Sequence, residues 1–415
     1  MSRPIFQAAG LDAGAIEVHL VQDRKINAFV AGGQRIFINT GLIMRTESAN
    51  QLLGVLAHEA GHIRGGHLAI LQEQMRNATA LAVLEMILAA GAAGAGGSIN
   101  RSGQGTGAGG NVPGQPGAPY ALKQLLAYNR AQEQAADQAG VTALERAGMS
   151  PRGMVEVMRM LQQQERIYVG SGADPYLRSH PSSSERIAFL EEMVSRSRTA
   201  NVPDPPAFKE MHARMVAKTL GYFEPARALQ KYPSGDNSVA GRYGRAMALF
   251  RMGQAAAAVA MADQLIRENP RDPYFHEFRG DVLRDSGRPG DAVASYAQAV
   301  ALSPGDAALR FGLAQAQSGA GRHADAAKTL EQVVRVEPTN GGAWDLLART
   351  YAALGNQPMT DLATAEKFYL EGPEKRSAAL HKADAAARAL PRGSPAWQRA
   401  TDLRAAIEAD RPSRR

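Results

Sequence analysis

A period of 34 residues in the second half of the chain limits what that half can fold into. Three kinds of position recur at this spacing: a glycine (Gly253, Gly287, Gly321 and Gly355), an alanine (Ala258, Ala292 and Ala326) and a proline (Pro270, Pro304 and Pro338). A turn glycine, a small residue early in the next helix and a terminal proline suit a unit of two packed helices. Because each such unit buries its apolar face against its neighbours, the pattern predicts a stacked helical solenoid.

This order of residues at this period is the signature of tetratricopeptide repeats. The predicted units are 237–270, 271–304, 305–338 and 339–372. The fourth unit is degenerate, because Thr360 replaces the alanine and Gly372 replaces the proline. Residues 207–236 and 373–415 are expected to form further helices that close the two ends of the stack. The concave surface of such a stack favours a peptide-binding or protein-binding role over that of a bare scaffold.

The first half contains an H-E-x-x-H motif at 58–62, inside a segment with helical periodicity and a capping box at 48–51. On a helix His58 and His62 point the same way, so both imidazoles can bind one metal ion. Glu59 lies one position along, where its carboxylate can reach a metal-bound water. Zinc lowers the pKa of such a water to about 7, and a glutamate can accept its proton. The motif therefore predicts a zinc hydrolase.

A third protein ligand is expected from a second helix, predicted over 120–147. Glu133 and Asp137 are four residues apart in it and therefore share one face. We expect Glu133 to bind the metal and Asp137 to accept the remaining N–H of a ligating histidine, which fixes its tautomer. A solvated acidic face is the alternative, and the histidine motif upstream weighs against it.

Leu68 and His67, which follow the motif, narrow the class of metal site that the motif can form. A metzincin carries its third histidine six residues after the second, where this chain has Leu68. His67 would be rotated by about 140° from His62 on a continuous helix, so we expect it to lie outside the ligand set.

The H-E-x-x-H motif followed by R-x-x-E-x-x-A-D at 130–137 resembles the gluzincin metallopeptidases of the HtpX/BepA type. Three more segments agree with that family, in the family order: Asn27-Ala28-Phe29-Val30, Arg35 to Leu42, and Ser179 to Ile187. The resemblance covers about residues 15–195, with Asn129 and Ala135 as departures at positions that are not expected ligands. It implies an α+β zincin-type domain, mostly helical with a small sheet, that binds one Zn²⁺ per chain as a metalloendopeptidase.

A small sheet is also predicted from the residues themselves. Apolar residues alternate with polar ones over 16–20 and 36–38, and Gly32-Gly33 between them predicts a hairpin turn. A substrate peptide can add to the free edge of such a sheet as an extra strand. The residues expected on this edge strand are Asn27, Ala28, Phe29 and Ile36.

His180 precedes Pro181 in a loop that leads into a predicted helix. The resemblance implies that His180 approaches the zinc, either as a fourth ligand that holds the enzyme inactive or as a group that stabilises the tetrahedral intermediate. A surface histidine is the alternative. Arg186 is expected to pair with a carboxylate of the site.

Two unusual segments separate the predicted metal helices. Residues 78–95 are almost wholly apolar, and we expect a helix that packs over the site or touches a membrane surface rather than spanning a membrane. Residues 91–119 are rich in glycine and are predicted to be a flexible loop. That loop is either a lid over the cleft or a tolerated insertion.

Composition and linkers set the remaining limits. A proline-rich linker at 199–206 separates a predicted metallopeptidase domain, 1–198, from a repeat domain, 207–415. The net charge of +7 is spread without a basic and aromatic stripe, so no nucleic-acid partner is expected. The absence of cysteine excludes disulfides and cysteine–zinc sites.

The first residues show no signal peptide, which by itself favours the cytoplasm. The family resemblance instead implies the periplasm, with a signal peptide already removed.

Two functions follow from these observations. The resemblance implies a zinc endopeptidase that degrades misfolded or misassembled envelope proteins during outer-membrane β-barrel assembly. Its repeats would bind clients or the assembly machinery. The alternative is a periplasmic chaperone or adaptor with a normally latent protease centre. The intact set of His58, Glu59, His62 and Glu133 favours the enzyme.

Overall fold

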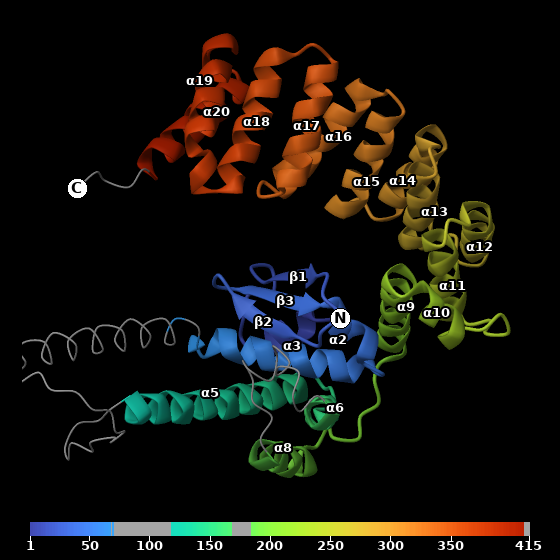
Figure 1. The fold of residues 1–415 in the computed structure, drawn as a ribbon, viewed down its shortest axis with the longest axis vertical. Helices are drawn as coiled ribbons and strands as arrows, with labels where there is room; N and C mark the ends of the chain where they lie inside the picture. The colour runs from blue at the N-terminus through green and yellow to red at the C-terminus, as the bar shows by residue number, and fades with distance from the viewer. Residues whose placement is uncertain (68, 70–117, 168–183, 411–415) are drawn as a thin grey trace, which may run out of the picture. The chain divides into compact units, whose positions relative to one another are not determined.

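A computed structural model describes residues 1–67, 69, 118–167 and 184–410 (Figure 1). Contacts divide the chain into two units, Met1–Thr219 and Leu220–Arg415. The first unit combines a small sheet with helices, and the second consists of helices, which confirms the predicted fold class. The first unit extends past the linker expected at 199–206, because His212 is buried in this unit. Its Nε2 atom lies 2.9 Å from Oγ1 of Thr46. The domain limits predicted from the sequence remain a prediction.

The first unit contains the elements that carry the histidine motif. In order they are α1 (Arg3–Ala8), β1 (Glu17–Val21), β2 (Ala28–Ala31), β3 (Arg35–Asn39), α2 (Thr40–Arg45), α3 (Ala49–Arg64), α5 (Ala118–Arg146), α6 (Arg152–Ile167), α8 (Ser184–Arg196) and α9 (Pro206–Phe223), whose last residues belong to the second unit. The sheet covers one side of α3, and α5 and α6 cover the other (Figure 1).

The sheet has the strand order β1-β3-β2. β2 and β3 form the predicted antiparallel hairpin, in which Gly32 and Gly33 adopt φ of 60° and 93°. Such left-handed backbone costs glycine little and other residues more. β1 instead pairs with β3 in parallel, so Ile36 lies between Val18 and Val30.

The prediction that Ile36 belongs to an edge strand is therefore wrong. Its strand is paired on both sides, and its side chain is fully buried. The edges of the described sheet are β1 and β2. Asn27 directly precedes β2, Ala28 is the buried first residue of this strand, and Phe29 stacks on Phe37 with ring centroids 5.1 Å apart.

Helix α3 runs through the centre of the first unit. Its N-terminus is capped by Ser48, whose Oγ accepts the backbone N–H of Gln51 at 3.2 Å. The Gln51 side chain accepts the N–H of Glu47 instead of that of Ser48, so only one bond of the predicted capping box is confirmed. Residues 49–61 are all buried, because elements pack on both sides of the helix. The histidine motif therefore lies on an enclosed helix.

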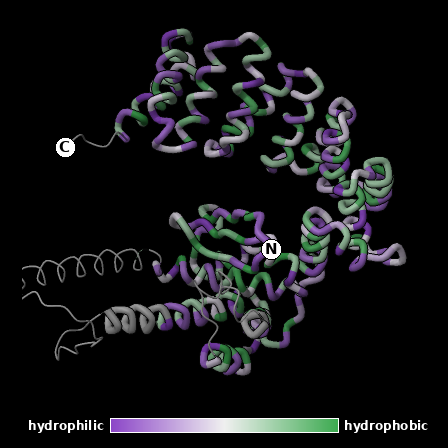
Figure 2. Tube along the Cα trace, viewed as in Figure 1, coloured by the Kyte–Doolittle hydropathy of each residue, from purple (hydrophilic) through white to green (hydrophobic). Residues whose placement is uncertain are grey.

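The second unit is the predicted solenoid. Its helices are α10 (Pro225–Lys231), α11 (Val239–Arg251), α12 (Ala255–Glu268), α13 (Pro273–Asp285), α14 (Pro289–Leu302), α15 (Ala307–Gly319), α16 (His323–Val336), α17 (Gly341–Ala353), α18 (Gln357–Glu371), the short 3₁₀ helix η1 (Pro373–Lys375), α19 (Arg376–Ala389) and α20 (Pro395–Ala409). Hydrophobic and hydrophilic residues are interspersed along these helices, as expected where each helix buries one face (Figure 2).

The periodic residues have clear roles in that stack. The four glycines at the 34-residue period have φ between 71° and 79° and make the turn between the two helices of each repeat. The alanines at this period are fully buried where the helices meet. In the degenerate fourth repeat Thr360 is only half-buried, yet α17 and α18 still form a packed pair. Among the described helices of the whole chain, none is long and apolar enough to cross a membrane.

Candidate metal centre

Three side chains from α3 and α5 converge on one point. The Nε2 atoms of His58 and His62 are 3.0 Å apart. Glu133 places Oε2 at 3.4 Å from Nε2 of His58 and Oε1 at 3.3 Å from Nε2 of His62. Donor atoms around a tetrahedral zinc ion with bonds of about 2.05 Å are about 3.3 Å apart. Two imidazoles and one carboxylate at this spacing form a group that could hold a metal ion.

A close approach of two helices brings Glu133 to the histidines. A Cβ atom added at Gly61 would lie 2.6 Å from the backbone oxygen of Ala136, so any larger residue there would push α5 away from α3. Ala136 lies between Glu133 and Asp137 along α5. The small residue inside the histidine motif thus sets the separation between the two sides of the site.

Gly61→Ala is therefore expected to weaken zinc binding by about 10-fold or more, because a ligand set must be held within about 0.5 Å of its working geometry. Gly54→Ala is the matched control. A Cβ there would meet Met154 of α6 at 2.8 Å, on a different neighbour of the same helix. Zinc affinity measured by chelator competition should fall mainly in the Gly61 variant. Equal affinities in the two variants would contradict the role given to Gly61.

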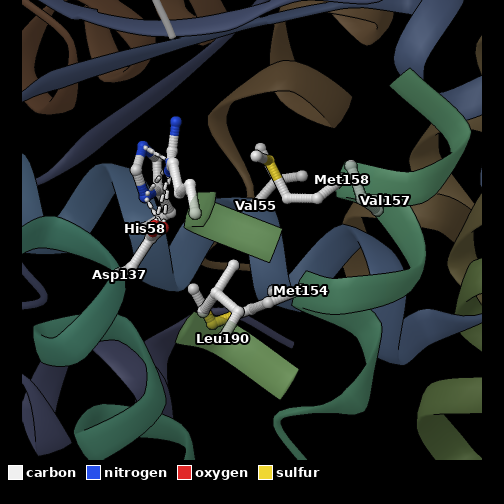
Figure 3. A pocket seen from close by; sticks show the side chains of 9 residues that line it. Val55, His58, Asp137, Met154, Val157, Met158 and Leu190 are labelled. Carbon is white, nitrogen blue, oxygen red and sulfur yellow. Dashed lines mark hydrogen bonds and ion pairs between the residues drawn. The ribbon is translucent and has the colours of Figure 1, made fainter. Parts of the chain in front are cut away.

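Asp137 and Arg186 contact two of the three converging side chains, His58 and Glu133, and hold them in place. Oδ1 of Asp137 lies 2.9 Å from Nδ1 of His58 (Figure 3), whereas Glu133 lies near Nε2 of the same ring. Arg186 of α8 donates to both oxygens of Asp137, through Nε at 2.5 Å and Nη2 at 2.9 Å. Its Nη1 lies 2.7 Å from Oε2 of Glu133. One guanidinium therefore joins the carboxylate facing the histidines to the carboxylate behind them.

These contacts shift the pKa values of the central groups. Burial by itself would lower the pKa of His58, but hydrogen bonds to Asp137 and Glu133 raise it to about 9. Burial would raise the pKa of Asp137, and Arg186 together with His58 holds it below its usual value instead. Asp137 is therefore an anion at neutral pH, as an acceptor for an imidazole N–H must be.

The charges buried here favour a divalent cation. Glu59, Glu133, Asp137 and Arg186 are all at most 5% exposed, so three carboxylates and one guanidinium are buried here. A dication that displaces the proton of His58 and binds both histidines in the neutral form would balance three ionised carboxylates and one guanidinium. A pocket of about 10 Å³ beside His58 is lined in part by apolar side chains, among them those of Val55, Met154 and Leu190 (Figure 3). Apolar side chains lower the local dielectric constant and so strengthen electrostatic interactions in the site.

The structure places most of the predicted site residues in one cluster. His58, His62 and Glu133 come together, Asp137 and Arg186 lie directly behind them, and Glu59 is fully buried in α3. His180, the apolar segment 78–95 and most of the glycine-rich segment 91–119 lie outside the described residues.

Sequence reasoning misses two features of this cluster. It pairs Arg186 with a single carboxylate, whereas the guanidinium contacts both Glu133 and Asp137. It places His67 outside the ligand set without a role, whereas Nδ1 of His67 lies 2.9 Å from Nδ1 of His62. Gly65-Gly66, directly after the end of α3, is the signal that could have shown the second feature, because glycine after a helix turns the chain back.

Comparison with known families agrees with this fold. Residues 2–194 match "Peptidase family M48", and residues 243–307 and 283–350 match two "Tetratricopeptide repeat" families. Residues 2–194 therefore form a peptidase domain of family M48, and tetratricopeptide repeats follow it in the chain. The fold class expected from the sequence is confirmed for both halves.

Particular proteins are similar to much or part of this chain. The chain is 27% identical over 381 residues to the "Beta-barrel assembly-enhancing protease" of Yersinia pestis, an alignment that covers 89% of this chain and 74% of that protein. It is 25% identical over 220 residues to the "Mitochondrial metalloendopeptidase OMA1" of Schizosaccharomyces pombe, covering 50% of this chain and 58% of that protein. A solved structure described as "YrrB: a TPR protein with an unusual peptide-binding site" aligns at 20% identity and a TM-score of 0.34, covering 41% of this chain and 90% of that one.

Proposed function

We propose that this chain is a zinc metalloendopeptidase of the gluzincin type, with His58, His62 and Glu133 as its protein ligands. The spacing of 3.0–3.4 Å between their donor atoms carries the proposal, because it matches the edges of a tetrahedron around zinc. Asp137 fixes the tautomer and orientation of His58, and Arg186 holds both Asp137 and Glu133 in place.

A zinc ion held by His58, His62 and Glu133 would supply Lewis acidity to the attacking water and to the scissile carbonyl. Glu59 acts as the general base: it accepts a proton from that water and returns it to the nitrogen of the leaving amine. Burial of Glu59 within α3 supports this role, since it keeps the carboxylate on a rigid helix beside the ligands. His180 is a candidate for a fourth ligand that holds the enzyme inactive, or for a group that stabilises the tetrahedral intermediate.

We propose that the substrate binds as an added strand along β2. This strand is hydrogen-bonded to β3 on one side, is an edge of the described sheet, and packs on α3. Backbone pairing along such an edge holds an extended peptide with little regard to its sequence. Asn27, Ala28 and Phe29 are then the residues nearest to the bound chain.

The likeness to a β-barrel assembly-enhancing protease extends the proposal to a process. We propose that the enzyme degrades misfolded or misassembled envelope proteins during outer-membrane β-barrel assembly, in the periplasm. The repeats would bind the clients or the assembly machinery, and segment 78–95 would give peripheral membrane contact. The domain limits proposed are 1–198 and 207–415, with the linker 199–206 between them. The second candidate is a chaperone or adaptor with a latent centre, which the repeats favour because they provide a surface for protein partners.

Metal analysis tests the proposed ligand set directly. Purified full-length protein is expected to hold about one zinc per chain, and dialysis against a chelator should remove both the zinc and casein cleavage. Adding zinc back should restore cleavage. His62→Ala should lose the zinc, whereas His381→Ala, an exposed histidine of the second unit, should keep it. Zinc retained in full by His62→Ala would rule out the ligand set.

A further inference from the structure

His67 lies against the side of the His62 ring that faces away from the other proposed ligands. The Nε2 atom of His62 is directed toward His58 and Glu133, while its Nδ1 atom is 2.9 Å from Nδ1 of His67. The two rings are nearly perpendicular, at 80°, with centroids 5.0 Å apart. An edge-on ring at this distance presents its nitrogen to the neighbouring N–H in hydrogen-bond geometry.

The turn after α3 is built to bring His67 back to this place. The helix ends at Arg64, and Gly66 adopts φ of 63°, the left-handed backbone that reverses the chain after a helix. The His67 ring then lies over Gly65. A Cβ atom added at Gly65 would sit 2.3 Å from Nε2 of that ring and under 3 Å from two of its carbons. Glycine at both positions therefore allows the ring to reach His62.

We propose that His67 is a positioning residue for the metal ligand His62. To offer the lone pair of Nε2 to a metal, a neutral His62 must carry its proton on Nδ1. That proton is donated to Nδ1 of His67, which in turn carries its own proton on Nε2. His67 thereby does for His62 what Asp137 does for His58: it fixes the tautomer and the ring orientation. The inference rests on the proposed zinc site and adds a residue to it.

Substitutions at position 67 separate a hydrogen bond from simple packing. In asparagine Oδ1 is bonded to Cγ as Nδ1 is in histidine, so His67→Asn keeps an acceptor close to its present place. His67→Leu removes the acceptor and keeps apolar bulk. Gly65→Ala leaves His67 unchanged in sequence and displaces its ring. Together these variants change either the side chain at position 67 or the place of its ring.

The test measures zinc affinity of the full-length chain by competition with a chromophoric chelator, with the absorption spectrum of bound Co²⁺ as a second readout. His67→Leu and Gly65→Ala are expected to weaken zinc binding by about 10–100-fold, as loss of a partner behind a metal ligand typically does. The Co²⁺ spectrum should change in the same two variants. His67→Asn should bind within a few-fold of the wild type and keep its spectrum.

Two results would overturn the inference. One is a wild type that binds one zinc tightly while His67→Leu binds it equally well. The other is a loss in His67→Asn as large as that in His67→Leu, which would show that the ring acts by packing alone. If the wild type itself holds no zinc, the proposed function fails instead, so the two failures are distinguishable. Hydrogen exchange of α3 in the metal-free variants identifies any that have lost their fold.

Discussion

Replacing Glu59 with glutamine is expected to lower kcat/KM for peptide cleavage by about 10²–10⁴-fold, the usual contribution of a general base. Glutamine keeps nearly the same size and shape, but its amide cannot accept a proton from the attacking water. Zinc content should stay near one per chain, because Glu59 is not a proposed ligand. The measurement pairs a cleavage assay on an unfolded substrate with metal analysis of the same sample.

The same variant separates the two candidate functions. If the chain acts mainly as a chaperone or adaptor, Glu59→Gln should support assembly of outer-membrane proteins as well as the wild type does. If proteolysis is the function, the variant should bind clients through its repeats and leave them uncleaved. Cleavage by Glu59→Gln at more than a tenth of the wild-type rate, with zinc bound, would rule out the assigned general base.

Arg186→Met is expected to destabilise the first unit by about 3–5 kcal/mol, the cost of breaking a buried ion pair by removing one partner. The substitution removes the guanidinium shared by Asp137 and Glu133, which are 1% and 5% exposed. Methionine fills much of the volume of arginine, so the loss reflects charge more than a cavity. Zinc affinity should fall as well, because Arg186 holds Glu133 in place.

Arg159→Met is the matched control. Arg159 pairs with Glu191 of α8 at 2.8 Å, but this ion pair is exposed, and its removal should cost less than about 1 kcal/mol. Both tryptophans, Trp344 and Trp397, lie in the second unit, so tryptophan fluorescence would report on the wrong part of the chain. Hydrogen exchange of peptides from α3 and α8, measured without metal, gives the opening free energy of the first unit. Equal effects of the two substitutions would show that the Arg186 cluster is not a buried electrostatic centre.

The parts of the fold that follow a local period can be predicted from the sequence. The glycines at a spacing of 34 residues mark the turns of the solenoid because left-handed backbone at each turn favours glycine. His58 and His62 share a face of α3 because residues four apart do so on any helix. The hairpin at Gly32-Gly33 forms for a comparable local reason.

Strand order is not a local property, and there the prediction was wrong. Ile36 has the alternating pattern of a strand, but the pattern does not show how many neighbours that strand has. The parallel pairing of β1 with β3 places Ile36 in the middle of the sheet. Parallel strands cannot be joined by a tight turn, so no short sequence signal marks their pairing.

The sequence by itself determined the zinc motif, the second acidic helix and the repeats, since each depends on residues a few positions apart or on a fixed period. The tertiary structure alone decided how these parts support one another. Arg186 reaches Glu133 and Asp137 from a helix about fifty positions further along, and His67 returns to His62 over two glycines. The physical reason is that a buried charge or ring is held by whichever element packs beside it, and packing joins residues without regard to their separation in the chain.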